Sequence, residues 1–328
     1  MKVTEVITKY AKNPILTAKD VPFPATLAYN CGACKVGSRY ALAFRTDYYR
    51  DDGTPDRMKW PRHLNIGLAW SEDGYHFKPE PKPILEPTPE ENGAAYDPRL
   101  HVVDGRYYLC YATDTRHGIR SGLAVSDDLH NWERIYLSEP DNRNAVMFPE
   151  RINGLLTRLD RPFARVYSSS RPYDIWLSQS PDGRFWGNHK LVLAAQDNEW
   201  SNDKIGPATP PIRTPHGWLA LYHGVTVDKN HPGCGWEGWW NKTYSAGVML
   251  LDLHEPWRII GRCKDPVLVP DQPYETEAGG GLRPNVVFPG GLVAEPDGTC
   301  KIYWGAADTV VAMGTARIQD LVDLCKHV

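Results

Sequence analysis

The stretch Asp104-Gly105-Arg106-Tyr107-Tyr108-Leu109 joins an acid–glycine turn to an aromatic strand. The same succession of turn and strand is found in five places, at residues 36–44, 104–109, 153–156, 216–222 and 297–304. Between them lies a second signature, a hairpin turn with an aromatic residue three positions after its corner, at residues 71–77, 126–132 and 180–186. Hairpins repeated about every 50 to 65 residues are typical of small antiparallel sheets arranged around an axis. We therefore predict an all-β fold, a five-bladed β-propeller.

The composition agrees with one large β domain. The chain has 328 residues, 41% of them hydrophobic, with 28 glycines and 28 prolines for turns. All-β folds of this size often form a single domain, so we expect residues 1–328 to be one catalytic propeller. Helical periodicity is confined to residues 316–325, where apolar residues stand at 318, 321, 322 and 325. We expect a short C-terminal helix there, packed on the outside of the ring or closing it.

Charge and hydropathy exclude several classes of partner. The formal net charge is -3 and no Lys/Arg-rich run is present, so nucleic acid is not an expected partner. Residues 1–9 lack the apolar core of an export signal, and no run approaches the roughly 18 apolar residues of a membrane span. We expect a cytoplasmic protein that does not bind membranes.

The cysteines and histidines do not predict a metal site or a cofactor. Cys31 and Cys34 have CxxC spacing, but no second pair or thioredoxin-like context accompanies them. We expect both to be small buried residues of a strand. The eleven histidines lack a paired ligand spacing, and no nucleotide-binding fingerprint is present.

Asp97 is the strongest candidate for a catalytic group. It lies between Tyr96 and Pro98 at the entry to an alternating run, where a loop meets a sheet. Such positions often carry chemistry, and the proline restricts the backbone next to the carboxylate. The alternative is an Asp that caps a turn. In a propeller, the functional groups should come from equivalent loops of different blades around the central channel.

Several ordered motifs resemble glycoside hydrolase family 130, the β-mannoside phosphorylases and related mannosidases. The most specific is residues 143–154 followed by Leu159-Asp160-Arg161-Pro162. Further motifs match at Tyr96-Asp97-Pro98-Arg99, Ile205-Gly206-Pro207, Tyr222-His223-Gly224-Val225, residues 284–289 and residues 303–308. The resemblance extends from about Asn30 to the C-terminus, and the five-bladed propeller of that family agrees with the repeat count.

This resemblance implies an inverting phosphorolysis, in which inorganic phosphate as co-substrate attacks a non-reducing β-mannosyl residue and gives α-mannose 1-phosphate. Asp97 matches the general acid, whose proton reaches the glycosidic oxygen through a hydroxyl of the mannose. The positions that match phosphate ligands are Arg143, Arg161, Lys204 and His223, with Tyr244 expected to join them. Those that match mannose ligands are Asn30, Arg45, Asp47 and Asp308.

Two other functions stay open at this point. One is a β-mannosidase or another glycoside hydrolase on a five-bladed propeller, and the other is a propeller that binds sugar without catalysis. The retained cations favour the phosphorylase, since the hydrolases of the family resemble it but have lost the phosphate ligands. Glu150 could be a second carboxylate of a hydrolase, but we expect it to pair with Arg151 or with an adjacent blade.

The sequence departs from the family at residues 230–240, which contain Trp236, Trp239 and Trp240 on a glycine-rich loop. Aromatic faces are natural platforms for sugar rings. We predict that Trp239 and Trp240 help bind the acceptor end of a β-mannoside oligosaccharide. Packing against the propeller rim and a contact in a homo-oligomer are the alternatives. The linkage and the acceptor sugar are left open.

Overall fold

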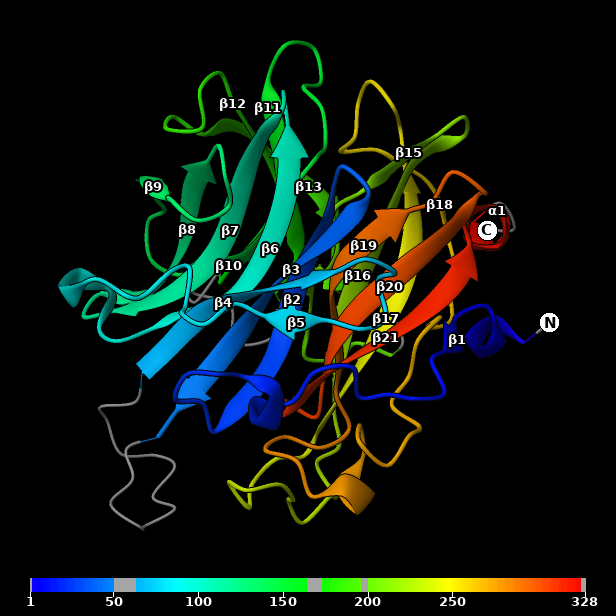
Figure 1. Cartoon of the computed structure of the whole chain (residues 1–328). Coiled ribbons are helices and arrows are strands. Elements are labelled where there is room, and N and C mark those ends of the chain that lie inside the picture. Colours follow the sequence, from blue (N-terminus) through cyan, green and yellow to red (C-terminus); the bar gives the residue numbers. More distant parts are fainter. Residues whose placement is uncertain (1, 50–62, 164–172, 196–199, 326–328) are drawn as a thin grey trace.

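The computed structural model describes residues 2–49, 63–163, 173–195 and 200–325. It contains five antiparallel sheets, which form the predicted five-bladed β-propeller (Figure 1). Each sheet is one blade, and the first strand of each blade lies innermost. Neighbouring blades contact one another through these strands, because β2 contacts both β6 and β19, and β10 contacts both β6 and β14.

The strands of blades 1 to 3 follow the chain without interruption. Blade 1 consists of β2 (Leu27–Val36), β3 (Arg39–Tyr48), β4 (His63–Ser71) and β5 (Lys78–Pro79). Blade 2 consists of β6 (Ala95–Val103), β7 (Arg106–Thr115), β8 (Gly118–Ser126) and β9 (Glu133–Leu137). Blade 3 consists of β10 (Asn142–Met147), β11 (Leu156–Pro162), β12 (Ile175–Ser180) and β13 (Gly187–Leu193).

Blades 4 and 5 depart slightly from this order. Blade 4 consists of β14 (Lys204–Pro207), β16 (Gly217–Val227), β17 (Lys242–Leu251) and β18 (Ile259–Arg262), with β15 (Ile212–Thr214) also paired to β16. Blade 5 consists of β19 (Val287–Ala294), β20 (Thr299–Ala306), β21 (Val310–Arg317) and the N-terminal β1 (Thr8–Lys9). The short 3-10 helices are η1 (Val3–Glu5), η2 (Ala18–Asp20), η3 (Pro89–Glu91) and η5 (Glu277–Gly279).

The five repeated stretches occupy equivalent places in the blades. Each contains or leads into the second strand, namely β3, β7, β11, β16 and β20. Gly105 and Gly298 turn the chain with φ of 76° and 83°, a backbone conformation that other residues adopt at a cost. The aromatic side chains that follow enter the core, where Trp304 and Tyr303 are fully buried. The prediction from the repeat is therefore confirmed.

The second signature forms the turn between the third and fourth strands of blades 1 to 3. In blade 1, the Ser71 hydroxyl accepts a hydrogen bond from the Gly74 N–H, and the Asp73 carboxylate accepts from the N–H groups of Tyr75 and His76. Ser126 with Asp128 and Ser180 with Asp182 make the same contacts in the next two blades. Each corner thus satisfies its own backbone donors, and this explains why the motif recurs.

The ends of the chain meet in blade 5. Strand β1 pairs antiparallel with β21 (Figure 1). The N-terminal segment therefore supplies the outermost strand of blade 5, and the C-terminal part of the chain supplies the other three. Helix α1 (Ile318–Cys325) packs on β17, β18 and β21, with Leu321 and Val322 buried. The helix predicted over residues 316–325 therefore begins two residues later, since residues 316 and 317 complete β21.

Cys31 and Cys34 are buried in β2 as free thiols, as expected, and burial raises the pKa of each to about 12. All seven cysteines lie in the described part of the chain, and none forms a disulfide. In the ranges that the structure describes, no helix has the length and apolar character needed to cross a membrane.

Candidate active site

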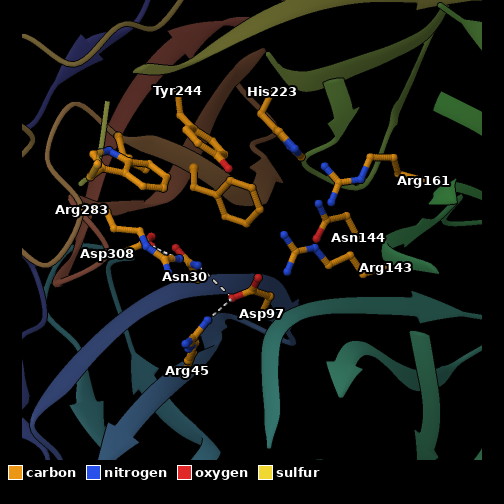
Figure 2. Close-up of a pocket in the computed structure, with 13 residues that line it drawn as sticks. Asn30, Arg45, Asp97, Arg143, Asn144, Arg161, His223, Tyr244, Arg283 and Asp308 are labelled. Atoms are coloured by element: carbon orange, nitrogen blue, oxygen red, sulfur yellow. Dashed lines mark hydrogen bonds and ion pairs between the residues drawn. The ribbon is translucent and has the colours of Figure 1, made fainter. Parts of the chain in front are cut away.

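One polar pocket lies at the end of the channel where the innermost strands begin, and all five blades contribute to it. Figure 2 shows Arg143, Arg161 and His223 on one side and Arg283 and Asp308 on the other. Between the two sides lie Asp97, Asn30 and Arg45. The residues that line the pocket are Asn30, Arg45, Asp97, Arg143, Asn144, Arg161, His223, Trp240, Tyr244, Arg283, Val286, Phe288 and Asp308. Most of the predicted site residues, which are far apart in the sequence, therefore meet here.

Backbone bulges turn three polar side chains into this pocket. The registers of β2, β6 and β10 each shift near their first residues, and a residue with positive φ stands at each shift. These residues are Asn30, Asp97 and Asn144, with φ of 38°, 53° and 62°. Asn and Asp tolerate this left-handed conformation better than other non-glycine residues, and a bulge re-aims the side chain that it carries. The same device therefore serves three successive blades.

Asp97 is a buried carboxylate surrounded by donors. Its Oδ1 accepts hydrogen bonds from Asn30 Nδ2 at 2.8 Å and from Arg45 Nη1 at 3.1 Å. Burial opposes ionisation, but the charges of Arg45 and Arg143 and the Asn30 hydrogen bond outweigh it, so the pKa of Asp97 is lowered. In the ligand-free protein the group is therefore an anion.

Asp47 does not line the pocket but lies behind Arg45. Its two carboxylate oxygens accept from Arg45 Nε at 2.6 Å and Nη2 at 2.9 Å, and the Tyr29 hydroxyl donates to it at 3.0 Å. Asp47 is fully buried. Its contacts hold the guanidinium of Arg45 against Asp97, so Asp47 orients a pocket residue and does not itself face the cavity.

The pocket wall that faces Asp97 carries basic side chains, some of whose nitrogens lack hydrogen-bond partners in the described part of the chain. Arg143 Nε, Arg161 Nε and Nη2 and both ring nitrogens of His223 are buried and have no hydrogen-bond partner among the described residues. The ring of Phe163 lies 5.2 Å from the Arg143 guanidinium and 4.6 Å from that of Arg161. Since buried polar groups are almost always paired, this wall has the character of an anion-binding site.

Mutual repulsion adds to burial in this cluster. Burial and the charge of Arg143 lower the pKa of Arg161 to about 9. Burial and the charges of Arg161 and Arg143 lower the pKa of Lys204 to about 6. Lys204 begins β14 next to the pocket, with its Nζ 3.4 Å from Asp203 and 5.6 Å from the Tyr244 ring. His223 is held neutral, because burial and the neighbouring cations lower its pKa strongly. A bound anion would relieve all of these costs.

Asp308 and Arg283 form the remaining wall. Burial raises the pKa of Asp308 to about 6, although Arg283, 3.5 Å away, opposes the shift. Arg283 also forms a two-pronged ion pair with Glu237, at 3.0 and 2.9 Å. Arg283 was not predicted as a site residue, although it directly precedes the motif at residues 284–289. The pair with Glu237 fixes the tryptophan-rich loop against the pocket.

The tryptophans of that loop have different places. Trp240 is 4% exposed, donates to the Pro284 carbonyl at 2.7 Å and stacks on Tyr244 with 5.7 Å between ring centroids. Trp239 is 51% exposed and is not part of the pocket lining. Trp236 donates to the Gly280 carbonyl. Rim packing therefore accounts for Trp236 and much of Trp240. Trp239 packs against Trp240, with 6.0 Å between ring centroids, but half of its side chain stays exposed.

A second cavity of about 250 Å³ adjoins the pocket and shares Arg45, Arg143 and Arg283 with it. Its other walls are Tyr29, Tyr49, Leu64, Tyr96, Asp114, Ile119, Glu237 and Leu282. Tyr96 donates its hydroxyl to Asp114 at 2.7 Å. No sequence motif marked Asp114 or Ile119, because the strands that carry them belong to the middle of blade 2.

Two other sequence predictions have structural outcomes. Glu150 pairs with Arg213 of blade 4 at 3.2 Å, which confirms a contact with an adjacent blade. Outside the pocket, His231, Cys234 and Glu277 bring three potential metal ligands together. The Gly233 N–H donates to His231 Nδ1, so the ring proton is on Nε2 and faces Glu277 at 3.1 Å. In this arrangement a metal could bind at Nε2 only after that nitrogen had lost its proton.

Comparison with known proteins gives one consistent family. The profile described as β-1,4-mannooligosaccharide phosphorylase matches residues 7–327. A β-1,4-mannooligosaccharide phosphorylase of Ruminococcus albus is 32% identical over 98% of this chain and 91% of its own length. A β-1,2-mannobiose phosphorylase of a Thermoanaerobacter species is 35% identical over 94% of this chain and 96% of its own.

A solved structure agrees with these matches. The β-1,2-mannobiose phosphorylase of Listeria innocua, in complex with β-1,2-mannobiose, superposes with a TM-score of 0.83 at 26% identity. The match covers 98% of this chain and 99% of that one. With its profile matched along almost the whole length, the chain belongs to glycoside hydrolase family 130, among the β-mannoside phosphorylases.

Proposed function

We propose that this phosphorylase works by inversion. Inorganic phosphate attacks the anomeric carbon of a non-reducing β-mannosyl residue, and the products are α-mannose 1-phosphate and the shortened acceptor. The observation that carries the proposal is the set of buried, unpaired nitrogens on Arg143, Arg161 and His223, which share one pocket with the Asp97 carboxylate.

In this proposal, phosphate binds to Arg143, Arg161, Lys204 and His223, with the Tyr244 hydroxyl beside them. Two guanidinium forks suit the oxygens of phosphate, because each can donate two parallel hydrogen bonds. Lys204 adds a charge once its pKa rises in contact with the anion. The cations then offset the repulsion between phosphate and the other acidic groups of the pocket.

Asp97 is the proposed general acid, which protonates the departing oxygen through a hydroxyl of the mannose. An inverting hydrolase needs a second carboxylate to activate water, whereas phosphate is already an anion and needs only to be positioned. Among the described residues that line the pocket, the wall opposite Asp97 carries cations and no carboxylate, which disfavours the β-mannosidase alternative. Asp97 is ionised before substrates arrive, and the negative charge of bound phosphate beside Arg143 favours its protonation.

The mannosyl residue is proposed to lie between Asn30, Arg45 and Asp308, whose side chains offer donors and acceptors for neighbouring hydroxyls. Asp47 contributes by holding Arg45. The acceptor sugar is proposed to lie in the adjoining cavity beside Asp114 and Glu237, with Trp239 as an outer platform. We also propose that residues 1–328 act as a single catalytic domain, since the pocket takes side chains from all five blades.

The substrate is proposed to be a β-mannooligosaccharide, and relatives named for β-1,2 and for β-1,4 linkages are similarly close in identity. The test is to incubate the protein with β-1,2- and β-1,4-mannobiose, with and without phosphate, and to identify products by NMR. We expect α-mannose 1-phosphate from one of them, only with phosphate.

Asp97→Asn is the matched variant, and it should abolish turnover while binding of the disaccharide, measured by calorimetry, is retained. Release of free mannose without phosphate would support a hydrolase instead. Binding without turnover of either disaccharide by the unmodified protein would support a sugar-binding propeller.

A further inference from the structure

Strand β6 carries polar side chains at positions 97, 99 and 101. Asp97 lines the active-site pocket, and His101 lines a separate cavity of about 310 Å³ at the other ends of the innermost strands. Arg99 lies between them on the same strand and is 1% exposed. Its guanidinium contacts Ala208 of blade 4 and Pro289 of blade 5, so Arg99 lies near the axis of the ring between the two cavities.

Arg99 is bound entirely by backbone carbonyls. Its Nη1 donates to the carbonyls of Asp97 and Pro98, at 3.3 and 3.1 Å. Its Nε donates to Ala208 of blade 4 at 2.6 Å, and its Nη2 donates to Pro289 of blade 5 at 3.5 Å. One guanidinium therefore joins the bulge that carries Asp97 to two other blades.

The surroundings are built to admit this side chain. A Cβ on Gly290 would lie 3.0 Å from the guanidinium carbon and Nη1, and it would also meet the Cys31 carbonyl oxygen. The ring of Phe288, which lines the active-site pocket, lies 4.9 Å from the guanidinium. No ion pair joins Arg99 to a carboxylate among the described residues, so four carbonyl dipoles, together with the nearby charge of Asp97, compensate its charge.

From this geometry we infer that Arg99 is a positioning residue for the reaction: it fixes the left-handed bulge at Asp97 and thereby the direction of its carboxyl group. The inference rests on the proposed role of Asp97 as the acid. Carbonyls that converge from three blades need donors at fixed angles. The planar fork of arginine supplies them, and the single ammonium of lysine does not.

The test compares substrates that differ in their need for an acid. The mannose that departs from a mannobiose must gain a proton, whereas 4-nitrophenyl β-mannoside releases a stable phenolate that needs none. We expect Arg99→Met to lower kcat on mannobiose by about 10²-fold, the size of effect that a misplacement of about 1 Å can have. Phosphorolysis of the nitrophenyl mannoside should fall only a few-fold, and the Kd for phosphate should stay unchanged.

Two variants complete the design. Arg99→Lys keeps the charge but not the fork, so it should show the same substrate pattern to a smaller degree and serves if the Met variant does not fold. Arg158→Met is the control for loss of a buried arginine, since Arg158 is 2% exposed and pairs with Asp160 away from the pocket. It should lose stability but lower activity on both substrates equally.

Equal losses on both substrates in the Arg99 variants, or no loss, would overturn the inference and leave Arg99 a purely structural residue. Asp97→Asn separates this from a failure of the proposed function. If Asp97→Asn loses as much activity on the nitrophenyl mannoside as on mannobiose, the assignment of Asp97 as the acid is wrong. If Asp97→Asn keeps most of its activity on the nitrophenyl mannoside and the Arg99 variants do not, only the role of Arg99 is wrong.

Discussion

Lys204 is the residue of the site whose charge depends most on the occupant of the pocket. Burial and the nearby charges of Arg161 and Arg143 lower its pKa to about 6, so in the ligand-free protein it is largely neutral at pH 7.5. Phosphate bound as proposed would place negative charge beside Lys204 and stabilise its ammonium form, which would raise the pKa again. Under this proposal, the binding of phosphate and the binding of a proton at Lys204 are coupled.

We predict that phosphate binding at pH 7.5 takes up protons, part of them at Lys204. Lys204 should have a higher pKa in the complex than in the free protein. The affinity for phosphate should therefore fall as pH rises through the pKa of Lys204 in the complex. Calorimetry in two buffers of different ionisation enthalpy measures the protons bound. Lys204→Met should bind about one proton fewer than the unmodified protein. The same uptake in both would contradict the coupling.

At the scale of elements, the loop at residues 230–240, which leads into β17, contains neighbouring tryptophans that are buried to different degrees. Trp239 and Trp240 are neighbours in sequence, but Trp240 is buried against Tyr244 and Trp239 is half exposed. The Glu237–Arg283 ion pair holds the loop at the edge of the pocket. The two tryptophans should therefore respond differently to the same substitution.

Trp239→Ala is expected to raise the acceptor KM several-fold in the synthetic direction, with little change in stability or in the KM for α-mannose 1-phosphate. Trp240→Ala should lower the free energy of unfolding by about 3–5 kcal/mol and impair every substrate, because it leaves a cavity behind Tyr244. Steady-state kinetics with acceptors of increasing length distinguishes the two. An acceptor KM unchanged in Trp239→Ala would exclude the platform role, and light scattering would reveal any change in oligomeric state.

For the whole molecule, the pairing of β1 with β21 ties the N-terminal segment to blade 5 before the chain continues into blade 1. Lys9 in β1 supplies Nζ contacts to Glu275 at 2.5 Å, to Asp271 at 2.7 Å and to the Val269 carbonyl at 2.8 Å. Glu275 is fully buried and also accepts from Trp304 of β20. The N-terminal segment is thus tied to the interior of blade 5 and to the chain that leads into it.

Lys9→Met should lower the free energy of unfolding by about 3 kcal/mol, because it leaves the buried Glu275 without its cation. Urea unfolding followed by tryptophan fluorescence at pH 7 measures the change. Lys12→Met is the control, since Lys12 is exposed and should have almost no effect. Equal stability of the two variants would show that the pair does not contribute to stability.

The sequence by itself determined the number of blades, and it marked Asp97 as the proposed acid and Arg143 and Arg161 as proposed phosphate ligands. Turn and strand signals are local, so each hairpin could be recognised within its own blade. The motifs around Asp97, Arg143 and Arg161 are also short, and their residue types carry the chemistry directly.

Only the tertiary structure decided how these residues face one another. It placed Asp47 behind Arg45, brought Arg283 and Glu237 to the pocket, opened the cavity beside Asp114 and set Arg99 near the axis. Apart from the Arg45–Asp47 pair, which lies within β3, these outcomes depend on contacts between blades or between strands of one blade, across separations that no sequence period encodes. The physical reason is that the site is identified by buried side chains and by donors without hydrogen-bond partners, and both arise only when the ring is closed.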